Sequence, residues 1–166
     1  MITIPGNLWC GGRGTFKSLD IPAGAVDNAA VKAAAGIEAE KLEHRHQMTF
    51  MPATSSTVAS AGTYALHAVY GTAGRIVSFA AGLISPCTGD ATVTVDLHKN
   101  GVTALSSTFD IDSGDAARTL VVGTIDPAKV TLAAGDVLEV VITVNAGTGV
   151  LGDGFFCRLV VNEDAA

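Results

Sequence analysis

Hydrophobic and polar residues alternate along most of the chain after residue 47, which is the pattern of half-buried β-strands. In ATVTVDLHKN (91–100), Val93, Val95 and Leu97 fall on one face of an extended chain, and the polar residues between them fall on the other. Comparable runs, rich in β-branched residues, recur along the chain. The pattern predicts seven strands: TYALHAVY (63–70), RIVSFAAGLI (75–84), ATVTVDLHKN (91–100), VTALSSTFDID (102–112), ARTLVVGTI (117–125), VLEVVITVNA (137–146) and FFCRLVVNE (155–163). An eighth is expected in TFMPA (49–53) or TVASA (57–61).

Glycine, proline and asparagine separate these runs and predict tight turns. The strongest turn signal is Asn100-Gly101, because the type I′ hairpin turn needs a positive φ at both central residues. Short strands joined by such turns indicate a mainly β fold, most simply a jelly-roll-like antiparallel β-sandwich. A sandwich domain of residues 48–166 is large enough to fold alone.

Residues 1–47 lack this alternation. Proline and glycine divide them into pieces that are too short for isolated helices, although Asp27 can cap a helix over AAVKAAA (29–35) and EAEKLE (38–43) is a second helical candidate. The sequence therefore predicts an extended, partly helical N-terminal arm (1–47) before the sandwich. Its apolar residues have no core of their own and need a partner.

Charge separates the same two segments. The arm carries five basic and five acidic residues, so the sandwich domain carries the whole net charge of −6. Basic residues are not clustered, which argues against a nucleic-acid partner. No apolar run is long enough to span a membrane and the N-terminus lacks the features of a signal peptide, so we expect a soluble, unexported protein with no membrane partner.

A neutral, apolar arm joined to an acidic β domain without a long linker favours a symmetric assembly in which the arms meet near the axis. The alternative is that the arm folds back across an open edge of its own sandwich and covers the exposed hydrogen-bonding groups there.

The order of segments also resembles a known family. IPAGAVDNAAVKAAAGIEAEKL is followed by EHRHQMTF and then by a β domain with VTVDLHKNG and LAAGDVLEVVITVNAGTGVLGDGFF. Across residues 20–162 this order is similar to the trimeric head-fiber and capsid decoration (cement) proteins of tailed bacteriophages. The resemblance implies a virion structural protein, made in the host cytoplasm, that binds the major capsid protein on the capsid exterior and stabilises the phage head.

The same resemblance implies that the arm clamps a jelly-roll knob to the capsid. We expect the capsid contacts to be Leu8, Trp9, Phe16, Leu19 and Ile21, with the single tryptophan as the anchor. We expect the homotrimer contacts to be Val31, Ile37, Leu42, His44 and His46. The alternative function is a carbohydrate- or host-surface-binding β-sandwich module. An enzyme is not expected, because the usual sets of acid, base and nucleophile are missing from the sequence.

His44 and His46 are the candidate metal ligands. If the backbone is extended, residues i and i+2 point the same way, and three chains around an axis present six imidazoles, a set that suits iron or nickel. A helix continuing from EAEKLE separates the two rings by about 200° and removes the site. The alternative is a pair of solvated or interchain hydrogen-bonding histidines, and no other cofactor is expected.

Three further motifs have structural alternatives. DIDSGD (110–115) resembles part of a calcium loop, but aspartates that cap a turn are commoner. Asp136 is expected to bond turn amides. Asp153 lies in a glycine-rich loop of the kind that carries recognition at the end of a sandwich.

Cysteines and aromatic residues also suggest core positions. Cys10, Cys87 and Cys157 are spaced too widely for a disulfide framework or a zinc knuckle, and are expected to be isolated buried thiols. Four aromatic residues could stack on a sugar but are more commonly core residues in strands: Tyr64, Tyr70, Phe155 and Phe156.

Overall fold

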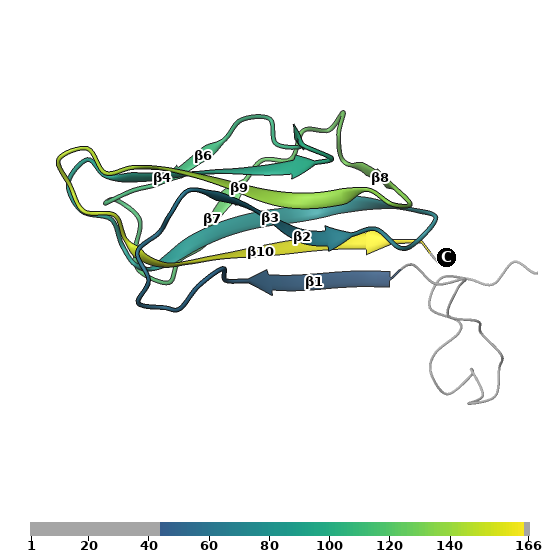
Figure 1. Ribbon diagram of the computed structural model, residues 1–166. Helices are drawn as coiled ribbons and strands as arrows, with labels where there is room; N and C mark the ends of the chain where they lie inside the picture. The colour runs from purple at the N-terminus through teal and green to yellow at the C-terminus, as the bar shows by residue number, and fades with distance from the viewer. Residues whose placement is uncertain (1–43, 165–166) are drawn as a thin grey trace, which may run out of the picture. The chain divides into compact units, whose positions relative to one another are not determined.

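The computed structural model describes residues 44–164, which form two antiparallel β-sheets (Figure 1). The first sheet has the order β1-β10-β3-β7, with β8 also paired to β3, and the second has the order β2-β9-β4-β5, with β6 also paired to β4. The strands are β1 (His44–Phe50), β2 (Gly62–Ala68), β3 (Ala73–Ser85), β4 (Thr92–Lys99), β5 (Val102–Thr103), β6 (Phe109–Ile111), β7 (Val121–Gly123), β8 (Thr131–Ala133), β9 (Val137–Asn145) and β10 (Asp153–Glu163). The mainly β prediction is confirmed.

The alternation in β4 gives the expected two faces. Val93, Val95 and Leu97 are fully buried between the sheets, while the residues between them are only half-buried. The hairpin after β4 is also confirmed, since Asn100 has φ 52° and Gly101 has φ 79°, the two positive angles that a type I′ turn needs.

The predicted strand at 102–112 is wrong as one element. It is broken into β5 and β6, because the chain leaves β4 after residue 104 and residues 105 and 106 bond to the other sheet. Leu105 forms an isolated bridge with Ile125, and the Ser106 amide donates to the Thr124 carbonyl at 2.9 Å. Strand β8 was not predicted, because its three residues are too few to show a period.

The eighth strand lies earlier than expected. The sequence placed it at 49–53 or 57–61, whereas β1 runs from His44 to Phe50 and includes the whole HRHQMTF segment. All seven residues of β1 pair with β10. The expected boundary between arm and sandwich, at residues 47 and 48, therefore falls inside this strand.

The core lies between the two sheets and draws on both. Its largest fully buried side chains include Phe79 and Ile76 of β3, Leu97 of β4 and Leu138 of β9. The Phe79 ring meets the Phe109 ring edge-on at 6.1 Å between centroids. These aliphatic and aromatic contacts hold the described part of the chain together, and the two cysteines within it are free.

Candidate functional site

The sandwich has one side at which β1 and β2, the outer strands of the two sheets, lie next to each other. A row of histidines crosses this side. The His44 and His46 rings stack with their centroids 6.3 Å apart, and the His46 ring lies 5.7 Å from the His67 ring of β2. The backbone at His44 and His46 is extended, so the prediction that both rings share a side holds and the helical alternative is wrong for these two residues.

A buried carboxylate ends the histidine row. Glu163, the last residue of β10, is only 4 % exposed. It accepts hydrogen bonds from the His67 Nε2–H, from the Gly71 amide at 2.9 Å and from the Tyr70 amide at 3.2 Å. Burial on its own raises the pKa of Glu163, but these hydrogen bonds outweigh it and hold the pKa below its usual value. The carboxylate is therefore ionised at neutral pH and joins the end of the first sheet to the β2–β3 turn.

Apolar side chains continue the row toward the other end of β1. The Phe50 and Tyr64 rings lie 5.6 Å apart between centroids. Met48 and Leu66 are half-buried beside them and pack against the core. We call the six side chains His46, Met48, Phe50, Tyr64, Leu66 and His67 the β1/β2 edge. It presents a mixed aromatic and apolar surface with imidazoles at one end.

Among residues 44–164, no group of three or more His, Cys, Asp or Glu side chains is placed to hold a metal ion. One chain brings together only the His44–His46 pair from the predicted metal site. The six-imidazole ring needs three chains, so it stays a prediction.

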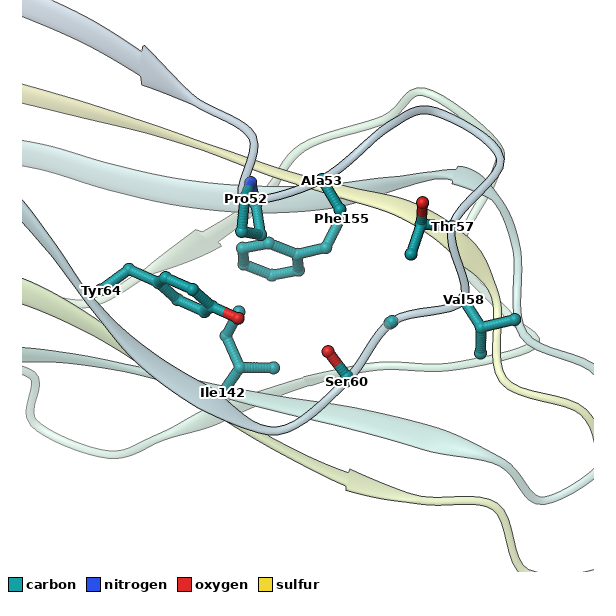
Figure 2. A pocket seen from close by; sticks show the side chains of 9 residues that line it. Pro52, Ala53, Thr57, Val58, Ser60, Tyr64, Ile142 and Phe155 are labelled. Carbon is teal, nitrogen blue, oxygen red and sulfur yellow. The ribbon is translucent and has the colours of Figure 1, made fainter.

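A small hollow lies under the loop between β1 and β2 (Figure 2). Pro52, Tyr64, Ile142 and Phe155 surround it, and its volume is about 30 Å³. That is room for about one water molecule. The hollow is therefore too small to enclose a sugar.

The aspartates of the two turn motifs bond to backbone amides, as the structural alternatives predicted. Asp112 accepts from the Gly114 amide at 2.6 Å, and Asp115 accepts from the Asp112 amide at 3.0 Å. Asp136 accepts from the Ala133 amide at 2.8 Å, which is the main cause that lowers the pKa of this carboxyl. These oxygens act as turn caps.

Asp136 has a second role that the sequence did not reveal. It accepts from the Asn100 side-chain amide at 2.7 Å, while Asn100 Oδ1 accepts from the Val137 amide at 2.8 Å. The β4–β5 turn and the β8–β9 turn are thereby clamped together.

Cys87 and Cys157 are free and buried, which confirms the expectation for these two thiols. Burial raises the pKa of Cys157 to about 12. The aromatic candidates do not form a common platform: Phe155 is buried, Tyr64 and Phe156 are half-buried, and only Tyr70 is largely exposed. Asp153 begins β10, pairs with Ser85 and bridges Val58, so its backbone is part of the sheet framework.

Eight predicted contact residues lie outside the described residues: Leu8, Trp9, Phe16, Leu19, Ile21, Val31, Ile37 and Leu42. Cys10 and both predicted helices lie outside them as well. His67 and Glu163 were missed by sequence reasoning, because they are 96 residues apart and only the pairing of the sheets brings them together. The available signal was a lone glutamate at the end of the apolar run FFCRLVV.

In comparisons with known proteins, no family model matches this chain, and no curated protein matches it. Within residues 44–164 there is also no helix with the length and apolar character needed to cross a membrane.

Proposed function

We propose that the chain is a virion structural protein: a homotrimeric capsid decoration (cement) or head-fiber protein that binds the major capsid protein and stabilises the phage head. The observation that carries this proposal is the position of β1. It follows the arm directly at His44, and all seven of its residues pair with β10, which lies inside the first sheet between β1 and β3. A pull on the arm is therefore shared by seven residue pairs, which suits a segment that clamps a knob to a shell.

We also propose that the sandwich is a jelly roll. The strand order supports this, because β1, β2, β3 and β4 alternate between the two sheets, as do β9 and β10. The short strands do not alternate one by one: β5 and β6 stay with β4 in the second sheet, and β7 and β8 both join the first. Repeated crossing between two antiparallel sheets is the arrangement of the jelly roll.

Reinforcement of a shell needs buried interface and no chemical step, because any partner that binds only the assembled state stabilises that state by mass action. The proposal therefore assigns no catalytic residue. It keeps the arm residues as contacts with the capsid and with the other copies, and it places the protein on the capsid exterior.

The decisive experiment compares heads of the phage that carries the gene, with and without this protein, for the temperature at which they release DNA. A higher release temperature with the protein supports the proposal, and equal temperatures contradict it. Co-sedimentation with heads locates the contact: Trp9→Ala is expected to abolish binding, while Tyr70→Ala, which truncates a largely exposed aromatic residue of the sandwich, is the matched control.

The proposed homotrimer also forms the predicted metal site. Three chains supply six imidazoles from His44 and His46, an octahedral nitrogen set that suits iron or nickel. Elemental analysis of the purified trimer is expected to give one transition-metal ion for three chains. A trimer without stoichiometric metal contradicts the metal site and leaves the capsid proposal standing.

A further inference from the structure

We propose that copies of this chain meet along the β1/β2 edge and close into a three-membered ring in which the basic flank of one copy lies on the acidic flank of the next. This inference rests on the homotrimer of the proposed function and names the surface that builds it.

The two sides of the sandwich differ in how they are closed. On the β5–β8 side, backbone hydrogen bonds join the sheets: the Ser106 amide donates to the Thr124 carbonyl at 2.9 Å, and the Asp126 amide donates to the Ala104 carbonyl at 2.9 Å. On the other side, no backbone bridge joins β1 to β2 within residues 44–164. The contacts described there all involve side chains, so among residues 44–164 that side leaves two strand edges unpaired, beside a row of half-buried aromatic and apolar side chains.

The outer face of the first sheet is basic. Cross-strand partners share a face of a sheet, and the register places Arg45 of β1, Arg158 of β10 and Arg75 of β3 on the outer face. No acidic residue shares that face on the described strands. The Arg158 Nε is buried and has no hydrogen-bond partner among residues 44–164.

The outer face of the second sheet is acidic. Glu139 of β9, Asp96 of β4 and Asp110 of β6 point outward there, and no lysine or arginine shares that face on the described strands. The sandwich domain carries a net negative charge, so its composition alone would not place a basic face on one sheet. The basic and acidic residues are therefore separated onto opposite faces. The two faces are complementary to each other in charge.

Strand β2 allows another chain to approach closely. Its outward residues Thr63, Ala65 and Ala68 are all small and exposed. Ala65 is the cross-strand partner of Glu139, so a chain that approaches across β2 passes only a methyl group before it meets the glutamate. Arg45 lies on the other flank, on β1 at the outer margin of the first sheet.

A ring follows from where these flanks converge. Opposite faces of a flat sandwich stack into an open filament, whereas flanks that meet at one edge close around an axis when that edge points inward. With the β1/β2 edge at the axis, the Arg45 flank of each copy meets the Glu139 flank of its neighbour. Strand β1, one of the two strands of this edge, begins at His44, directly after residue 43 in the sequence.

The test is a charge exchange read by native mass spectrometry over a dilution series. Arg45→Glu and Glu139→Arg are each expected to raise the concentration at which half of the chains are trimeric by roughly tenfold or more, because the ring repeats each contact three times. The double variant Arg45→Glu/Glu139→Arg restores opposite charges at every contact. It is expected to return to within about threefold of the wild-type midpoint.

Two matched controls carry similar changes away from the edge. Lys129→Glu reverses a charge on the β7–β8 loop, and Val122→Lys adds a charge to β7, the far margin of the first sheet. Both are expected to leave the midpoint unchanged. Added salt is expected to weaken the wild-type trimer, which supports the charge pairing without any variant.

The outcomes separate the two proposals. If the wild type is a trimer and both single reversals, folded by circular dichroism, keep its midpoint, the edge is wrong and the trimer stands. If the double variant is no better than the singles, the charge pairing between copies is refuted. A monomeric wild type overturns both the ring and the homotrimer, while head stabilisation is judged by the separate DNA-release measurement.

Discussion

Replacing Glu163 by alanine is expected to be among the most destabilising single substitutions in the sandwich. The carboxylate is almost fully buried and accepts hydrogen bonds from the His67 ring and from the backbone amides of Tyr70 and Gly71. Alanine leaves these donors without their acceptor and removes the link between the end of β10 and the β2–β3 turn.

The magnitude follows from those contacts. A buried donor that loses its partner costs about 1–3 kcal/mol, and breaking a buried charged pair by removing one member costs about 3–5 kcal/mol. We expect the free energy of unfolding to fall by about 3–5 kcal/mol. For a domain of this size each kcal/mol lowers the melting temperature by about 3–4 °C, so Glu163→Ala is expected to melt roughly 10–20 °C below the wild type.

Thermal unfolding by far-ultraviolet circular dichroism at pH 7 and one fixed chain concentration measures this effect. Asp164→Ala is the matched control, since it removes the adjacent, exposed carboxylate. If Glu163→Ala melts within about 3 °C of Asp164→Ala, a difference worth about 1 kcal/mol, the carboxylate is not the link described above.

The same carboxylate makes the stability of the sandwich depend on pH. Its pKa in the folded chain lies below the ordinary value of 4.5, so the unfolded chain takes up the proton first. The stabilisation that the Glu163 carboxylate provides is therefore fully present above about pH 4.5, and it is lost as the pH falls through the pKa of the folded chain. Glu163→Gln, which keeps an oxygen acceptor and cannot ionise, is expected to show a flatter loss of stability between pH 5 and pH 3 (a window set by the unfolded pKa). Parallel pH profiles for wild type and variant contradict this assignment.

Three other predictions concern separate features. Asn100→Ala removes both the turn residue and the hydrogen bond to Asp136, and is expected to cost about 1–3 kcal/mol in urea unfolding, whereas Asn100→Gly keeps the positive φ and is expected to cost less. Gly149→Ala places a Cβ 1.9 Å from a backbone carbonyl oxygen and is expected to lower the melting temperature by at least about 6 °C; an unchanged melting temperature contradicts the close approach. In a Cys10→Ser background, Cys157 is expected to resist thiol reagents at pH 8 until denaturant is added, because its pKa is raised to about 12 and its side chain is buried; rapid labelling of the native protein refutes this.

The long strands could be predicted because the alternation of apolar and polar side chains follows which face of each strand is buried. Val93, Val95 and Leu97 alternate with polar residues because one face of β4 is the core, and the Asn100-Gly101 turn follows from backbone sterics alone. The break between β5 and β6 could not be predicted in this way. It depends on Leu105 pairing with Ile125 of the other sheet, which is a tertiary contact without a local signal.

The candidate site was predictable only in part for the same reason. His44 and His46 share a strand, so their common side follows from a period of two. His67 and Glu163 join them through the neighbouring positions of β1, β2 and β10, and those positions are properties of the whole sandwich. Strand β1 itself was partly missed because three of its first four residues are charged or imidazole side chains, which resemble a surface segment.

The pairing of β1 with β10 also orders the events of synthesis. β1 is the first described strand and β10 the last, so β1 has no sheet partner until the ribosome has delivered residues 153–163. Pairing across such a sequence separation is slow compared with local hairpins. The surface proposed to bind other copies is therefore completed only after the rest of the sandwich has been synthesised. Association is delayed until each chain can fold, and chains that end before β10 are kept out of the assembly.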